Sequence, residues 1–210
     1  MHMQSNWAAE HLLVIRTLME RSAIYRRALA PIVLSLGVLG MAAAGIGWSL
    51  GIEQARGFVG YWSGVGLVGV SGAYLLARQQ ALKAAECFWS APTRRVTQAL
   101  LPPLFVGFVA SSVSVLFSDV HPSAAWWTMP LWMVLYGCAV HAAGFFMPRG
   151  MKLFGWGFIL AGCILGARLS VGGAMNSLMA GHWIMGGSFG GLHLAYGVYL
   201  FFTEKSQNEP

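Results

Sequence analysis

Six stretches of this chain are long and apolar enough to cross a lipid bilayer. They cover about residues 28–51, 57–77, 99–118, 126–147, 152–171 and 183–203. Each is close to the ~20 residues that an α-helix needs to span ~30 Å of hydrocarbon. Because lipid offers the backbone no hydrogen-bond partner, such segments have to be helical. The sequence therefore predicts an all-α, polytopic membrane protein with a bundle of six transmembrane helices over residues 28–203.

The composition supports a membrane protein and leaves little room for a soluble domain. Hydrophobic residues make up 57% of the chain and charged residues 10%, whereas soluble domains carry about 25% charged residues. Neither an HExxH nor a Walker motif occurs in the sequence. We therefore expect no enzyme of the metalloprotease or nucleotide-hydrolysing kind, and the chain reads as non-enzymatic.

The formal net charge of +6 is spread unevenly about the six stretches. One side of the predicted bundle carries Arg16, Arg21, Arg26, Arg27, Arg78, Lys83, Arg94, Arg95, Arg149, Lys152 and Lys205. The connections on the other side carry Arg56. Cytoplasmic loops of membrane proteins are enriched in Lys and Arg, so both termini are expected in the cytoplasm. The same rule explains the basic character without a nucleic-acid partner.

The two ends of the chain are expected to lie on the cytoplasmic side. Residues 1–27 predict an amphipathic helix, capped by Ser5 or Asn6. A basic amphipathic helix beside a span is typical of the membrane interface, and the alternative is a docking helix for a cytosolic partner. Residues 204–210 are expected to form a short cytoplasmic tail.

The longest cytoplasmic connection runs from about residue 78 to 98 and mixes aromatic and basic side chains. Phe88 and Trp89 are followed within a few positions by Arg94 and Arg95. Aromatic residues at this depth commonly anchor a protein in the interface, and basic clusters attract anionic lipid. A binding site for a protein partner is the alternative. These four residues are the candidates for cytoplasmic interactions.

Small residues recur at helical spacing within several predicted spans. The first span carries Gly40, Ala44, Gly47 and Gly51, the second Gly60 and Gly64, and the last Gly186, Gly190 and Gly197. Such stripes let helix backbones approach each other, and packing rather than hydrophobicity drives association in lipid. The sequence predicts a tight bundle, with oligomerisation of the whole chain as a further possibility.

Three ionisable residues fall inside the predicted spans, where they are costly and therefore functional candidates. They are His141, Arg168 and His193. His193 shares a stripe with the glycines of the last span, so we expect it to point into the bundle. The simplest role for each histidine is a hydrogen bond to a neighbouring helix. For Arg168 the alternatives are a side chain that reaches the outer surface and a vestibule shared with His182 and Asn176.

Histidines at this depth are also potential ligands. His141 and His193 on facing spans would be suitable axial ligands for haem. Cys138 lies one turn from His141 and would add a metal ligand, although zinc requires three or four. No fourth ligand is evident, so haem or metal is a minor alternative and no cofactor is expected.

Three functions remain compatible with the sequence. The first is a non-enzymatic module that binds a partner or regulates it through the cytoplasmic face. The second is a small transporter or channel for an apolar or anionic solute, lined by His141, Arg168 and His193. The third is a haem- or metal-binding membrane protein. All seven acidic residues lie in loops, tails or span ends, which argues against a proton pump.

Four strings in the chain carry a resemblance to known sequences. They are EHLLVIRTLMERSAIYRRALAP, FWSAPTRRVTQALLPP, HAAGFFMPRGMKLFGW and GGLHLAYGVYLFFTEK. Together they resemble an uncharacterised family of small bacterial membrane proteins over most of the chain. The resemblance implies six spans in a bacterial inner membrane and supplies no catalytic residues.

Overall fold

The computed structural model describes residues 29–83, 85, 88–147, 150–172 and 177–206 of the 210-residue chain. Within these residues all regular structure is helical and no strand occurs. The all-α prediction is therefore confirmed for the described part of the chain. The amphipathic helix predicted for residues 1–27 lies outside the described residues, as does the end of the tail, 207–210.

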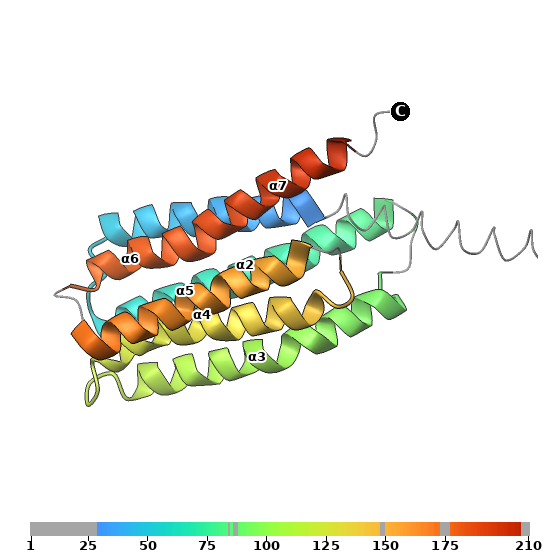
Figure 1. Ribbon diagram of the computed structural model, residues 1–210. Coiled ribbons are helices and arrows are strands. Elements are labelled where there is room, and N and C mark those ends of the chain that lie inside the picture. Colours follow the sequence, from blue (N-terminus) through green and yellow to red (C-terminus); the bar gives the residue numbers. More distant parts are fainter. Residues whose placement is uncertain (1–28, 84, 86–87, 148–149, 173–176, 207–210) are drawn as a thin grey trace, which may run out of the picture.

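Long helices follow one another along the chain. The first helix, Leu29–Ser49, precedes α2 (Ala55–Lys83), α3 (Ala91–Leu116), α4 (Ala124–Ala143) and α5 (Gly150–Gly172). The last run consists of α6 (Met179–Met185), the π-helix η1 (Gly186–Gly191) and α7 (Leu192–Ser206). Figure 1 shows the helices side by side, with their connections gathered at two opposite ends.

Four helices are long and apolar enough to cross a membrane: the first helix, α2, α3 from Thr93, and α5. The other two predicted spans fall short for different reasons. The 20-residue α4 is long enough, but its tryptophans, Pro130 and His141 keep its mean hydropathy below that of the four candidate helices. The last run is divided by η1, so that neither its 7-residue nor its 15-residue α-helical part has the ~20 residues of a crossing.

The predicted cytoplasmic connection is mostly helical. The connection between the second and third spans was expected over about residues 78–98, whereas α2 continues to Lys83 and α3 begins at Ala91. Proline at the start of a helix is favourable because the first backbone N–H groups have no partner there. The Ser90-Ala91-Pro92 sequence therefore begins α3, with Ser90 as its N-cap residue.

Glycines of the first helix and the last run pack against each other, as their stripes predicted. A Cβ atom on Gly40 would lie 2.8 Å from the backbone nitrogen of Gly190, and one on Gly186 would meet Ala44. Only glycine allows backbones to approach so closely. In Figure 1 the first helix and the α6–α7 run lie side by side along one edge of the bundle.

Other glycines behave differently from the prediction. Gly60 and Gly64, the GxxxG pair of α2, have open space where a side chain would be. Gly51 does not extend the stripe of the first helix, because it lies beyond its end with a φ of 64°. The closest approach of α4 and α5 involves Gly137 and Gly155 instead, since a Cβ on Gly155 would lie 2.7 Å from the backbone nitrogen of His141.

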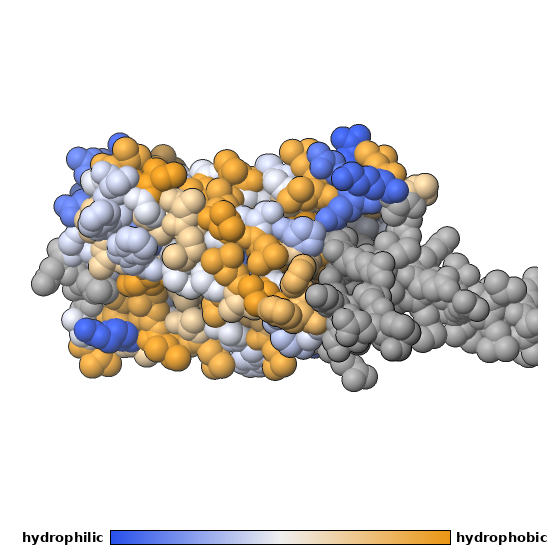
Figure 2. Space-filling model, turned by 90° about the horizontal axis from the view of Figure 1, so that it is seen from above, coloured by the Kyte–Doolittle hydropathy of each residue, from blue (hydrophilic) through white to orange (hydrophobic). Residues whose placement is uncertain are grey.

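The outside of the bundle is apolar between two polar ends. Large side chains on α2 and α3 are exposed, among them Val68 (60%), Phe105 (66%) and Leu116 (70%). Figure 2 shows hydrophobic residues across the middle of the molecule and hydrophilic residues toward the ends. This distribution is that of a protein with lipid as its solvent.

Candidate functional site

The cytoplasmic candidates lie on the short connection between α2 and α3 and near the start of α3. The ring of Phe88 packs edge-on against Tyr74 of α2, with 5.1 Å between the ring centroids. The neighbouring Trp89 is 55% exposed and lies 6.3 Å from Phe88. Phe88 therefore anchors the connection on α2, and Trp89 is presented at the surface.

Arg94 and Arg95 are both exposed near the start of α3, as its fourth and fifth residues. Neither guanidinium forms a hydrogen bond or ion pair with another described side chain or backbone group. The first turn of a helix carries partial positive charge, which disfavours cations by about 0.3–1 kcal/mol each. Two arginines held at this position, beside an exposed tryptophan, form a strongly cationic surface. We call Trp89, Arg94 and Arg95 the cationic patch.

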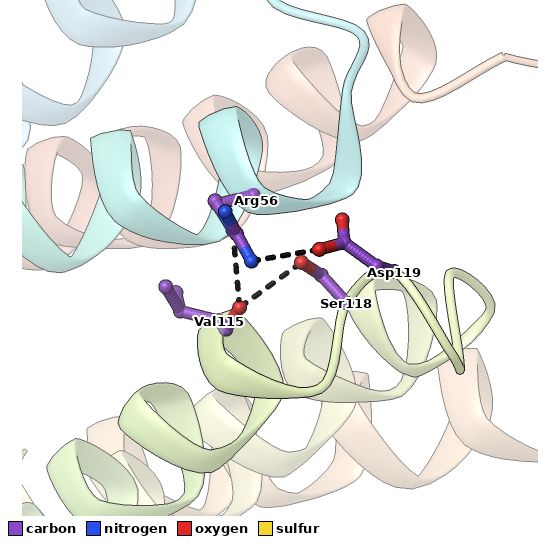
Figure 3. Close-up of polar contacts among 4 residues, drawn as sticks. All are labelled: Arg56, Val115, Ser118 and Asp119. Atoms are coloured by element: carbon purple, nitrogen blue, oxygen red, sulfur yellow. Dashed lines mark hydrogen bonds and ion pairs between the residues drawn. The ribbon is translucent and has the colours of Figure 1, made fainter.

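At the opposite end of the bundle, one arginine is paired with a carboxylate. Arg56 lies 2.9 Å from the Asp119 carboxylate and donates from Nε to the Val115 carbonyl over 3.3 Å (Figure 3). Ser118 donates to the same carbonyl over 3.0 Å. A second contact joins Ser177 to the Glu53 carboxylate over 2.8 Å. The connections at this end are therefore tied together, whereas the cationic patch has no such partner among the described residues.

His193 is buried between α4, α5 and the last run, as predicted from its glycine stripe. Its Nδ1 bonds to the carbonyl of Phe189, so Nδ1 carries the proton. Its Nε2 then accepts a hydrogen bond from the Tyr136 hydroxyl over 2.7 Å. Rings of Phe154 and Phe158 enclose the imidazole at 5.0 and 5.4 Å. Both ring nitrogens are occupied, so His193 is a neutral bridge between helices.

His141 lies elsewhere, on the C-terminal half of α4. Its Nδ1 donates to the carbonyl of Lys152 over 3.3 Å, and its ring lies 5.8 Å from Trp156. Trp156 is two residues from both Phe154 and Phe158, the neighbours of His193. Because two residues correspond to about 200° around a helix, α5 stands between the two histidines.

A cofactor would have to displace existing bonds at these positions. Ligation through Nε2 of His193 requires loss of the Tyr136 hydrogen bond, and the two histidines pack on opposite faces of α5. Cys138 is an exposed thiol. The residues that the structure describes contain no group of three or more His, Cys, Asp or Glu placed to hold a metal. The donor set therefore does not fit haem or zinc in this arrangement.

Arg168 is exposed near the C-terminal end of α5. Its guanidinium lies over Gly172, one turn closer to that end, as expected for a side chain that reaches the polar surface. His182 does not line an open vestibule, because it is completely buried. Asn176, the third residue of the suggested vestibule, lies outside the described residues. The solute path through His141, Arg168 and His193 stays a prediction, since these side chains share no contact.

His182, expected from the sequence as a residue of an open vestibule, instead makes two hydrogen bonds inside the bundle. His182 accepts a hydrogen bond from Trp62 Nε1 over 3.1 Å and donates from Nε2 to the Ile52 carbonyl over 3.0 Å. Phe58 contacts the same ring edge-on at 5.0 Å. A signal was present, because tryptophan and tyrosine buried in a span need a polar partner. The sequence positions of Trp62 and Tyr136 within spans therefore indicated that each would need a hydrogen-bond acceptor on another helix.

The string GxSxG, typical of serine hydrolases, occurs twice, at residues 47–51 and 186–190. The catalytic form places the serine on a strained turn between a strand and a helix. Here Ser49 and Ser188 lie in helices and donate to carbonyls of their own helix, those of Ile46 and Ile184. Neither serine is hydrogen-bonded to a histidine among the described residues.

Comparison with known proteins adds no further identification. No protein-family model matches the chain, and no curated protein and no solved structure is similar to it.

Proposed function

We propose that the chain is a non-enzymatic integral membrane protein whose cytoplasmic face binds an acidic segment of a partner protein. The binding site is the cationic patch of Trp89, Arg94 and Arg95. The observation that supports it is the exposure of this patch, with neither guanidinium paired to a described residue. Arginine and tryptophan are the residue types most enriched at the centres of protein interfaces.

The position of the two arginines near the N-terminal end of α3 favours binding of an anionic group. Two cations at the positive end of a helix are unfavourable in the isolated protein, and a bound carboxylate removes that cost. Arginine presents a planar fork of donors that matches a carboxylate. Packing of Phe88 on Tyr74 holds the patch in position before binding, which lowers the entropy lost on association.

The same proposal includes six crossings, with α4 and the α6–η1–α7 run as the fourth and sixth. Burial supports α4 as a crossing helix, because ten of its residues are buried and its less apolar side chains face protein more than lipid. Six crossings put both termini on one side, and the excess of basic residues makes that side the cytoplasm. A bacterial inner membrane and the family resemblance belong to this proposal.

A photo-crosslinking amino acid at position 89, in cells that express the protein, tests this function. We expect a defined protein adduct that is lost in the Arg94→Glu/Arg95→Glu variant and largely kept in Arg94→Lys/Arg95→Lys. Trp127 is exposed to a similar extent, 48%, at the other end of the bundle, so a crosslinker there is the matched control. Adducts with lipid alone, or an adduct that survives charge reversal, would contradict the proposal and favour anionic lipid at this surface.

A further inference from the structure

The last run of the bundle changes its hydrogen-bond spacing in the middle. Residues Gly186–Gly191 are π-helical, with bonds between residues five apart. Leu192 N–H already returns to the Ser188 carbonyl, four residues back. The segment therefore holds one residue more than an α-helix of the same length. Such π-segments are rare and occur frequently at functional sites.

Each side of η1 is fixed by its own histidine. His182 ties α6 to α2 through Trp62 and to the preceding connection through the Ile52 carbonyl. His193 ties α7 to α4 through Tyr136. In an uninterrupted α-helix these histidines, 11 residues apart, would point within about 20° of each other. The extra residue in η1 turns them about 80° apart, so that each reaches a different neighbour.

The composition of η1 permits more than one arrangement. Four of its six residues are glycine. Gly186 and Gly190 contact the first helix, at Ala44 and Met41, whereas a side chain on Gly187 or Gly191 would meet open space. Glycine populates backbone conformations that other residues avoid. The side of η1 with Gly186 and Gly190 is therefore packed against the first helix, whereas no neighbouring helix restrains the side with Gly187 and Gly191.

We propose that η1 is a register joint, which gives α7 a second position relative to α6. In the second position η1 becomes α-helical. As a result α7 turns by about 100° about its axis, and its cytoplasmic end moves about 1.5 Å along that axis, away from α6. His193 then leaves Tyr136. The Tyr136–His193 hydrogen bond holds the register described above, and its loss transmits a change in the core to the cytoplasmic end of α7.

Distance measurement between two spin labels tests the joint. Labels at Leu101→Cys on α3 and Val198→Cys on α7 sit at exposed positions on two well-separated helices (Figure 1). Cys87, Cys138 and Cys163 are changed to serine in this background. We expect one distance in the parent protein and a second one, shifted by several ångströms, in Tyr136→Phe. A single unchanged distance in Tyr136→Phe would overturn the proposal.

Two controls separate a register shift from general loosening. Trp132→Phe removes a comparable interhelical bond, from Trp132 Nε1 to Ser111 over 2.8 Å, and should leave one distance. Deletion of Gly187 removes the extra residue, so the protein should fold with a regular helix, and adding Tyr136→Phe should no longer produce the second distance. A second distance that persists without Gly187, or a Gly187 deletion that unfolds the protein, contradicts the joint.

Discussion

Aromatic donors supply the polar contacts between helices in this bundle. Trp62 donates to His182, Trp132 to Ser111 and Tyr136 to His193. In each case an apolar ring fills the space between helices while one N–H or O–H group finds a buried acceptor. An unpaired polar group would cost several kcal/mol in such surroundings. The three bonds therefore specify which helix faces adjoin, beyond what apolar packing alone determines.

Loss of His182 should be the most damaging change among the histidines. His182→Ala leaves the buried Trp62 N–H without its acceptor and the partly buried Ile52 carbonyl without its donor, and it empties a completely buried position. Each unsatisfied group costs about 1–3 kcal/mol, so we expect the free energy of unfolding to fall by about 2–4 kcal/mol. Unfolding in detergent measures it. His121→Ala, at an exposed position, is the control and should change stability by less than about 0.5 kcal/mol. Equal effects of the two substitutions would refute the role of His182.

At this scale the sequence indicated the right kind of contact without its partners. The simplest expectation, a hydrogen bond from each span histidine to a neighbouring helix, agrees with His193 and His141. Tyr136 lies 57 positions from His193, and nothing in the local pattern of either residue pairs them. Such partners follow from the way helices rotate against each other, which one helix alone does not determine.

Among the elements, α4 and α5 approach each other closely enough for their backbones to meet. Gly137 and Gly155 allow their backbones to touch, whereas a Cβ on Gly157 would meet open space. Gly155→Ala should therefore lower the free energy of unfolding by about 1–3 kcal/mol through overpacking. Gly157→Ala, in the same helix, should be neutral or slightly stabilising because alanine favours the helix. Thermal unfolding of the two variants in one detergent checks this difference, and equal midpoints would be inconsistent with the described packing.

Helix boundaries and helix partners differ in how far the sequence predicts them. The expected spans lie within the observed helices or exceed them by a few residues, because the length of each apolar stretch can be read directly from the sequence. The sequence does not show which glycines pack against another helix. Gly60 and Gly64 have the same spacing as tightly packed pairs, yet a side chain at either position would meet open space. The π-helix was also missed, because the glycine-rich string of η1 suits an ordinary close-packed helix equally well.

Charge is distributed over the whole molecule in a way that opposes its reversal in the membrane. At one end lie Arg78, Lys83, Arg94, Arg95 and Lys152, and at the other Arg56 is paired with Asp119. Movement of unpaired arginines through hydrocarbon is costly. The proposed orientation follows from this asymmetry together with an even number of crossings.

Reporter fusions in a bacterial inner membrane test that orientation. A fluorescent protein that folds only in the cytoplasm should be active after Lys83, Met147 and at the C-terminus. Alkaline phosphatase, which needs the oxidising outer side, should be active after His121 and after Ser177. Activity of the phosphatase after Met147 would mean that α4 does not cross, and the six-span arrangement would have to be abandoned.

The position of α4 has a consequence for how the protein is made. Unlike α3 and α5, this helix does not reach the hydropathy of a candidate membrane span, and it packs most extensively against those two helices. A segment with three tryptophans, a proline and a histidine partitions weakly into lipid by itself. During synthesis α4 should therefore stay at the insertion machinery until α5 emerges, and the two should enter the bilayer as a hairpin. Ribosomes stalled just before α5 would then leave α4 accessible to water, and stalling after α5 would not.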